Sequence, residues 1–214
     1  MHPLAAVLSG DLIDSSQSEP AQADATLNTL ENTLPFIVAG AAGTRFTRNR
    51  GDGWQIHLAD PGNAYRVSVC LTATLRSDPD CLATRIAIGI GTVANPGTAG
   101  FAGASGEAFT ASGGALDKMK PGQTLAIAGT GADPSQQSQI AFTAHLMSGW
   151  SRERAEVVAL MIRHGAPNHQ VIADLLGITR QAVGARLHSA GYKLLCNASL
   201  AFRDHIENLA RSHA

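Results

Sequence analysis

Two neighbouring side chains, Arg180 and Gln181, are of the types that read guanine and adenine edges in the major groove of DNA. They directly follow Thr179, a good N-cap residue, so both would lie in the first turn of a helix. Gly184 and Arg186 would lie on or near the outer face of that helix. The N-terminal half of such a helix is the part that reaches the bases. The pattern therefore predicts contacts between these residues and double-stranded DNA.

A preceding short helix and a tight turn are needed to position those side chains. The apolar residues of the preceding helix recur at helical intervals, at Val171, Ile172, Leu175 and Leu176. Gly177 supplies the left-handed backbone that ends this helix, and Ile178 would fill the gap between the two helices. The second helix turns three apolar residues inward, Ala182, Val183 and Leu187. Residues 169–192 therefore predict a helix-turn-helix, with a plain helical hairpin as the alternative.

A pair of carboxylates, Asp11 and Asp52, is the second group that could do chemistry. The apolar run 4–9 predicts a buried strand that delivers Asp11 to its carboxyl end. Asp52 and Gly53 form an Asp-Gly pair, the strongest short signal for a β-hairpin. Carboxylates at adjacent strand ends offer hard oxygen ligands for Mg²⁺, with substrate phosphates completing the shell. The alternative is that Asp52 only makes the hairpin turn and Asp11 only caps a turn.

Predicted strands and helices alternate along the first 130 residues. The expected order is strand, helix, hairpin, helix, strand, helix and strand, over residues 4–9, 20–33, 44–59, 61–75, 84–92, 106–119 and 124–128. Pro35 is expected to end the first helix, and the glycine-rich segment 96–106 either approaches a ligand or only connects a strand to a helix. Such an alternation predicts a mixed sheet with helices packed on it. Later helices are expected over 137–147, 152–164 and 192–212.

This order, together with segments 9–16, 46–54 and 85–91, resembles the catalytic domain of class III nucleotide cyclases. The whole arrangement, with a helix-turn-helix at its end, is similar to the SatD family, and the helix-turn-helix itself resembles region four of sigma factors. The resemblance implies an α+β fold, with a cyclase-like (ferredoxin-like) mixed sheet and an all-α helix-turn-helix domain after it. The implied division is 1–130 for the cyclase-like domain, 131–150 for a linker or connecting helix, and 151–214 for the DNA-binding domain.

The cyclase resemblance also implies a ligand, a nucleotide bound with Mg²⁺. In that family, an Asp at the end of the first strand and an Asp in the hairpin hold the metal ions, and Asp11 and Asp52 match these positions. The backbone of residues 12–16, which begins with Leu12 and Ile13, would cradle phosphate. Arg48 stands where the family has a base-recognising Lys, which keeps the charge and changes its geometry.

Other positions depart from the cyclase pattern. The family's transition-state Asn and Arg would fall on Thr110 and Gly114, and its purine-reading Asp on Gly103. No arginine occurs between Arg85 and Arg152. A cation near the transferring phosphoryl group supplies much of the transition-state stabilisation in this chemistry. The sequence therefore predicts that the chain is not an enzyme, with an active nucleotidyl cyclase as the alternative.

Charge is distributed unevenly along the 214 residues, whose formal net charge is −1. From residue 151 onward there are eight Lys/Arg and five Asp/Glu, a balance of +3, whereas residues 1–150 have eight and twelve, a balance of −4. A basic C-terminal unit fits DNA binding there. Because the positive balance is modest, one copy would hold the phosphate backbone weakly, and a homodimer is expected.

The remaining composition narrows the class of protein. The three cysteines, Cys70, Cys81 and Cys196, have no metal-ligand spacing and are expected to be reduced and structural. No apolar run is long enough to span a bilayer, so a cytoplasmic protein without a membrane partner is expected.

The last predicted helix has one apolar side, formed by Leu195, Ala198, Phe202, Ile206 and Leu209. Such a face must be buried, either on its own domain or on a partner chain. The expected function is a sequence-specific transcription regulator whose cyclase-like domain dimerises, senses a ligand, or both. A helix-turn-helix that docks another protein is a further alternative.

Overall fold

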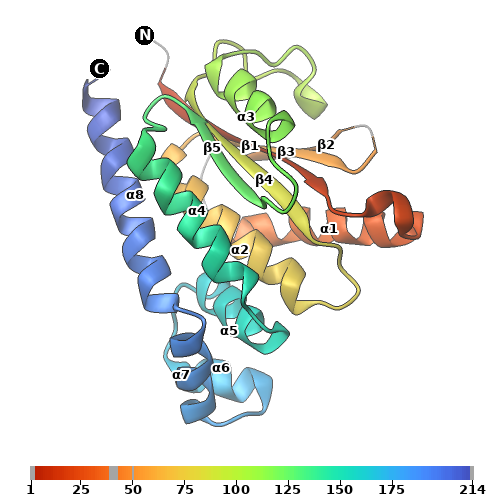
Figure 1. The fold of residues 1–214 in the computed structure, drawn as a ribbon, viewed down its shortest axis with the longest axis vertical. Helices are drawn as coiled ribbons and strands as arrows, with labels where there is room; N and C mark the ends of the chain where they lie inside the picture. The colour runs from red at the N-terminus through yellow and green to blue at the C-terminus, as the bar shows by residue number, and fades with distance from the viewer. Residues whose placement is uncertain (1–2, 39–42, 50, 213–214) are drawn as a thin grey trace.

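A five-stranded mixed sheet lies at the centre of the computed structural model, which describes residues 3–38, 43–49 and 51–212 (Figure 1). The strands are β1 (Leu4–Leu12), β2 (Arg45–Arg48), β3 (Gly53–Leu58), β4 (Thr84–Thr92) and β5 (Leu125–Gly129). Their order across the sheet is β2-β3-β1-β4-β5. Only the β4–β5 pair is parallel, and the other neighbours are antiparallel. The predicted mixed sheet is therefore confirmed.

Eight α-helices are described besides this sheet. They are α1 (Pro20–Ile37), α2 (Ala64–Ser77), α3 (Glu107–Asp117), α4 (Pro134–Ser148), α5 (Arg152–Arg163), α6 (His169–Leu176), α7 (Arg180–Ser189) and α8 (Tyr192–Ser212). Single 3₁₀ turns precede α1, α2 and α3 at Ser15–Gln17, Pro61–Asn63 and Ala99–Phe101. The succession β1-α1-β2-β3-α2-β4 is the ferredoxin-like unit, which β5 extends by one strand. The predicted α+β fold followed by an all-helical region is confirmed.

Helices α1, α2 and α4 cover one face of the sheet, and α3 covers the other (Figure 1). On the first face, Leu8 of β1 lies between Ile56 of β3 and Ile88 of β4 in register, and all three side chains are fully buried. Burying each contributes about 1.5–3 kcal/mol. The alternation of apolar residues along the strands thus builds the main core.

The opposite face uses small residues, which let α3 approach closely. A Cβ atom at Gly89 would lie 2.2 Å from the carbonyl oxygen of Ala108 in α3. The hydroxyl oxygens of Ser9 in β1 and Ser112 in α3 are 2.9 Å apart. Glycine at position 89 is therefore required by helix–sheet packing.

The helices after residue 150 share a core with the α+β part. Helix α5 packs on the outer side of α2, and one continuous apolar cluster includes Val157 and Val158 of α5 (Figure 1). The indole N–H of Trp150 donates to the carbonyl oxygen of Ala190 at 2.9 Å, which joins the start of α5 to the end of α7. Residues 131–150 include α4, whose Ile140 and Met147 are buried in the same cluster.

Helix α8 returns from the helical end and runs beside α4 (Figure 1). The ring of Phe202 is fully buried, with its centroid 5.9 Å from that of Tyr65 in α2. Arg203 pairs with Asp60 at 3.1 Å, just before α2. The apolar side of this helix therefore packs on its own chain, which decides between the two expectations stated for it.

Two expected helix boundaries are wrong. Pro35 lies inside α1, which continues to Ile37. A proline so close to the end removes one N–H donor, and the N–H of Val38 still bonds to the carbonyl oxygen of Leu34 at 3.2 Å. Helix α4 begins at Pro134 instead of residue 137, because Asp133 caps it by accepting from the N–H of Gln136. None of the described helices is long and apolar enough to cross a membrane.

The buried His57 of β3 is expected to make the free energy of unfolding depend on pH. Burial, reinforced by the nearby Arg45, lowers the pKa of His57 below its usual 6.5, against a hydrogen bond to Gly43 that raises it. The unfolded chain therefore binds more protons than the folded one as the pH falls below about 6.5, and the free energy of unfolding falls in that range. We expect full stability above about pH 7 and a decline below it.

Urea unfolding of the wild type and of His57→Gln, at about pH 7.5 and about pH 5.5, checks this expectation. The variant should lose less stability on acidification than the wild type. Equal losses would show that His57 does not contribute to the pH dependence.

Candidate functional site

The turn between α6 and α7 has the geometry that the sequence predicted. Gly177 adopts a left-handed conformation with φ 63°, and the N–H of Ile178 bonds back to the carbonyl oxygen of Ala173 at 3.1 Å. The hydroxyl of Thr179 accepts from the N–H of Ala182 at 3.1 Å, which caps α7. A helix-turn-helix is therefore present over these residues. Its binding to DNA stays a prediction.

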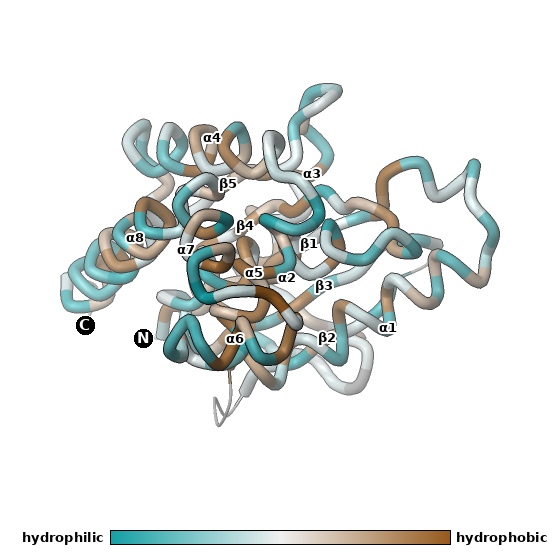
Figure 2. The backbone as a smooth tube through the Cα atoms, turned by 90° about the horizontal axis from the view of Figure 1, so that it is seen from below, coloured by the Kyte–Doolittle hydropathy of each residue, from teal (hydrophilic) through white to brown (hydrophobic). Residues whose placement is uncertain are grey.

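The first turn of α7 presents three predicted contact residues together. Thr179, Arg180 and Gln181 are all exposed. The side chains of Arg180 and Gln181 make no hydrogen bond or ion pair with any described residue, and Val183 behind them is fully buried. The buried side of α7 thus fixes the helix while its N-terminal turn leaves two planar polar groups available. Figure 2 looks onto this end of the molecule, where α6 and α7 lie in front.

The other two predicted contact residues are placed differently. Arg186 is half-buried, and its guanidinium lies 3.7 Å from the carboxylate of Glu156 in α5. The ion pair holds α7 against α5, so Arg186 is not a free cation on the outer face. Gly184 lies on the side of α7 that faces His169 of α6. Only the first turn of α7 therefore retains the predicted arrangement in full.

The apolar face of α6 is narrower than expected. Ile172 and Ala173 are buried and Leu176 is half-buried, but Val171 is 45% exposed and Leu175 is 57% exposed. A helix from His169 to Leu176 is short enough that α7 and α5 cover one stripe only. Val171 and Leu175, although they belong to the apolar pattern of the sequence, therefore stand on the surface.

Two glycine substitutions in this unit are expected to have opposite effects. Gly177→Ala places a Cβ in a left-handed conformation and should lower the free energy of unfolding by about 1–2 kcal/mol. Gly184→Ala lies inside α7, where the nearest atom to the new Cβ would be 3.8 Å away, and should raise it by about 0.5–1 kcal/mol. Urea unfolding of both variants measures the difference. Changes of the same sign would contradict this account of the turn.

The predicted carboxylates lie together in a second location. Asp11 at the end of β1 pairs in register with Gly53, the neighbour of Asp52, across β1 and β3. Both carboxylates line a cavity of about 420 Å³, which is called the carboxylate pocket below. Leu12 and Ile13, the predicted phosphate cradle, line it as well.

Arg85 of β4 occupies the position next to Asp11 in the carboxylate pocket. It pairs in register with Asp11, its Nε donates to Oδ1 at 2.8 Å, and its terminal nitrogen donates to Oδ2. Hydrogen bonding to Asp11, helped by the charges of Asp52 and Asp117, raises the pKa of Arg85. The Ser15 hydroxyl donates to the carboxylate of Asp52. Both predicted metal ligands therefore already have protein partners.

This arrangement does not fit the Mg²⁺ that the cyclase resemblance implies. Both carboxylate oxygens of Asp11 accept from Arg85, whose cation stands where a metal would need to bind. Among the described residues, no three acidic, histidine or cysteine side chains are grouped so that they could hold a metal ion. The Asp11 carboxylate is paired with Arg85 instead, and the Asp52 carboxylate accepts from the Ser15 hydroxyl.

Arg48 is not brought into the carboxylate pocket. Its guanidinium is turned toward α1, where it lies 3.7 Å from Asp24 and 3.6 Å from Glu31 and donates to Asn28. Thr110 of α3, one of the positions at which the sequence departs from the cyclase pattern, is exposed. The prediction that Arg48 contacts a nucleotide is therefore not supported by its position.

Sequence reasoning missed Arg85 and Ser15. The signal for Arg85 was available in principle, because it lies in the predicted strand 84–92 and would face Asp11 if β1 and β4 pair in antiparallel register. The register between β1 and β4, however, cannot be derived from the sequence pattern. Ser15 carries no comparable signal, since it lies in a 3₁₀ turn after β1.

Comparisons with solved structures find a distant similarity of fold to nucleotide cyclase domains. No family model and no curated protein sequence matches the chain. The active GGEEF domain of a diguanylate cyclase from Vibrio cholerae matches with 15% identity over 59% of this chain and 83% of that chain, with a TM-score of 0.43. A bacterial light-regulated adenylyl cyclase matches with 16% identity over 59% and 43% of the two chains, with a TM-score of 0.42. The guanylyl cyclase Cya2 matches with 17% identity over 59% and 77%, with a TM-score of 0.39. Membership of the SatD family stays a prediction.

Proposed function

We propose that this chain is a sequence-specific DNA-binding transcription regulator whose α+β part does not catalyse nucleotide cyclisation. The observation that carries the proposal is the capped first turn of α7. Thr179, Arg180 and Gln181 are exposed there on a helix whose other side is fixed by buried Val183 and Leu187. Arginine and glutamine at the start of such a helix have the hydrogen-bonding groups that distinguish guanine and adenine.

The charge distribution supports binding by a homodimer. Arg203 of α8 is paired with Asp60, which lies outside residues 151–214. The cationic surface left for phosphates is therefore smaller than the balance of +3 suggests, and two copies would bind DNA better than one. An exposed apolar side chain on α4, Phe142 at 75%, offers surface for pairing.

Genome-wide mapping of DNA occupied by the protein tests the proposal. The wild type should give discrete peaks that share a sequence, and these should be lost in Arg180→Ala and in Gln181→Ala. Lys120→Ala is the matched control, because it removes an exposed cation far along the chain from α7 and should leave the peaks in place. Peaks that persist in both α7 variants would refute the assignment. Failure to bind any DNA at low salt would favour a protein-docking role, for which exposed Val171 and Leu175 provide an apolar surface.

A nucleotide-using enzyme is the second candidate. The observation that favours it is that Asp11, Asp52 and Arg85 line one cavity. Incubation with ATP or GTP and Mg²⁺ or Mn²⁺ should give neither cyclic nucleotide nor pyrophosphate if the leading proposal holds. Product that disappears in Asp11→Ala and Asp52→Ala would establish the enzyme instead.

A further inference from the structure

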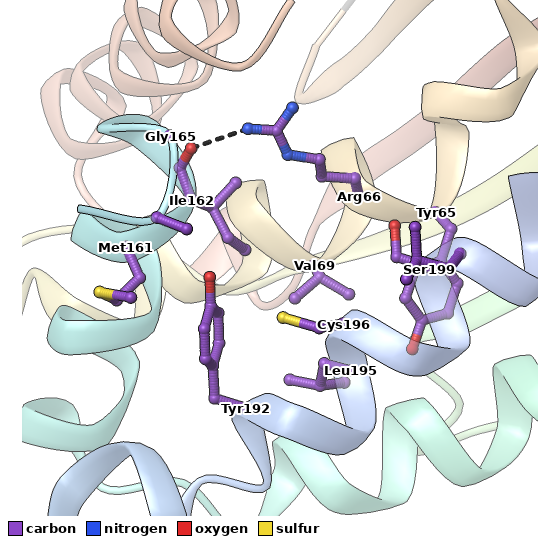
Figure 3. Close-up of a pocket in the computed structure, with 12 residues that line it drawn as sticks. Tyr65, Arg66, Val69, Met161, Ile162, Gly165, Tyr192, Leu195, Cys196 and Ser199 are labelled. Atoms are coloured by element: carbon purple, nitrogen blue, oxygen red, sulfur yellow. Dashed lines mark hydrogen bonds between the residues drawn. The ribbon is translucent and has the colours of Figure 1, made fainter. Parts of the chain in front are cut away.

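A cavity of about 480 Å³ lies between α2, α5 and α8, apart from both the carboxylate pocket and the first turn of α7 (Figure 3). Its volume falls within the range of small-molecule sites. We call it the helix pocket. Its apolar lining comes from Val69 of α2, Met161 and Ile162 of α5, and Leu195 and Leu200 of α8.

Arg66 of α2 is the only charged side chain among the described residues that line the helix pocket. Its guanidinium donates to the carbonyl oxygen of Ile162 at 2.9 Å, drawn as the dashed line in Figure 3, and to that of Ile37 at 3.3 Å. These bonds use only part of its five N–H donors. No described acidic side chain forms an ion pair with it. A half-buried cation beside an apolar cavity is stabilised by an anion that carries its own apolar surface.

Tyr192 adds a hydrogen-bonding group to the same space. Its ring rises from the start of α8 toward α5, with the hydroxyl directed into the pocket (Figure 3). Burial raises the pKa of Tyr192, so the hydroxyl stays protonated at neutral pH and can donate. Ser199, further along α8, adds a second hydroxyl to the lining. The polar groups are thus few and stand among apolar walls, as in sites that orient a small ligand.

We propose that the helix pocket binds a small monocarboxylate with an apolar body. The carboxylate would accept from Arg66 and from the hydroxyl of Tyr192, and the apolar body would lie against Val69, Met161 and Leu195. A nucleoside triphosphate does not suit this pocket, because one cation would face several phosphate charges among apolar walls.

The position of the helix pocket gives such a ligand a regulatory role, a consequence that rests on the proposed DNA binding. Its walls come from α2, which packs on the sheet, from α5, which leads into the helix-turn-helix, and from α8, which follows it. A ligand that contacts all three favours one arrangement of these helices. Ligand binding would then change the protein's affinity for DNA by a certain factor, and DNA binding would change its affinity for the ligand by the same factor.

Calorimetric titration of the full chain, without DNA, tests the site. Octanoate and 4-phenylbutyrate serve as an aliphatic and an aromatic probe, and octan-1-ol serves as an uncharged control. We expect at least one carboxylate to bind once per chain, and octan-1-ol to bind at least about tenfold more weakly than the octanoate it resembles. Absence of binding by both carboxylates would overturn the proposal, whatever the outcome of the DNA experiments.

Two variants distinguish binding in the helix pocket from nonspecific binding elsewhere on the protein. Arg66→Gln removes the charge, and Ser199→Met fills part of the cavity without altering Arg66, so either can report if the other fails to fold. Each should weaken carboxylate binding by at least about tenfold. Leu194→Ala, on an exposed part of α8 outside the pocket lining, should bind as the wild type does. Equal affinities in all these variants would overturn the proposal, as would a dimer whose partner chain excludes both probes.

Discussion

Replacing Phe202 by alanine is expected to lower the free energy of unfolding by about 3–5 kcal/mol. The ring is fully buried between α8 and α2, 5.9 Å from the ring of Tyr65 between centroids. Removing it takes away a large apolar surface and leaves a cavity between α8 and α2. Tyr65 is itself held by a 2.7 Å hydrogen bond to Thr143 of α4, so its ring is not free to fill the gap.

Urea unfolding measures this loss, with Leu194→Ala as the matched control. Leu194 lies on the same helix and is 65% exposed, so its truncation should change stability by less than about 0.5 kcal/mol. The two variants together test whether α8 is part of the chain's own core. Similar small effects in both would mean that α8 is only loosely attached in solution and that its apolar side serves another partner.

The elements with strong periodic patterns could be predicted from the sequence. The alternating run Thr84–Thr92 is a strand with the predicted bounds, and the last helix occupies Tyr192–Ser212 as predicted. Both predictions are confirmed because the buried residues recur along the sequence at the period of the strand or of the helix. Pro35 shows the limit of a local rule, because a proline in the last turn of α1 does not end the helix.

The partners of charged side chains could not be predicted in the same way. Helical periodicity places Arg186 away from the buried side of α7, but only the packing of α5 brings Glu156 to 3.7 Å from it. In the same way, Arg48 lies on β2 as predicted and is drawn to Asp24 and Glu31 because α1 runs beside it. Contacts of this kind depend on how distant elements dock, which no local pattern encodes.

One part of the candidate site could be predicted from the sequence and another part could not. The turn and cap of the helix-turn-helix depend on adjacent residues, Gly177 and Thr179, and could be predicted. The carboxylate pocket depends on the register between β1 and β4, which places Arg85 opposite Asp11. This register changes the expected chemistry, because Asp11 is held in an ion pair with Arg85 and is not a free carboxylate beside Asp52.

The second large effect is expected for DNA affinity in Arg180→Ala. If Arg180 contacts a guanine edge, the variant should lose about 1–3 kcal/mol of binding free energy at the specific site, which is roughly 5- to 150-fold in affinity. Because exposed Arg180 makes no hydrogen bond or ion pair with a described residue, its removal should leave the stability of the folded chain nearly unchanged. The loss would therefore report on DNA contact alone.

Fluorescence anisotropy with the occupied sequence and with an unrelated duplex, each at several salt concentrations, separates base contact from phosphate contact. A base contact predicts a large loss on the specific sequence, a small loss on the unrelated duplex, and relaxed preference at one base position. A phosphate contact predicts similar losses on both sequences and a shallower dependence on salt. Lys120→Ala should behave as the wild type on both duplexes, since Lys120 follows α3 in the α+β part. Equal losses on the two sequences in Arg180→Ala would leave α7 on the DNA backbone and assign sequence recognition to other residues.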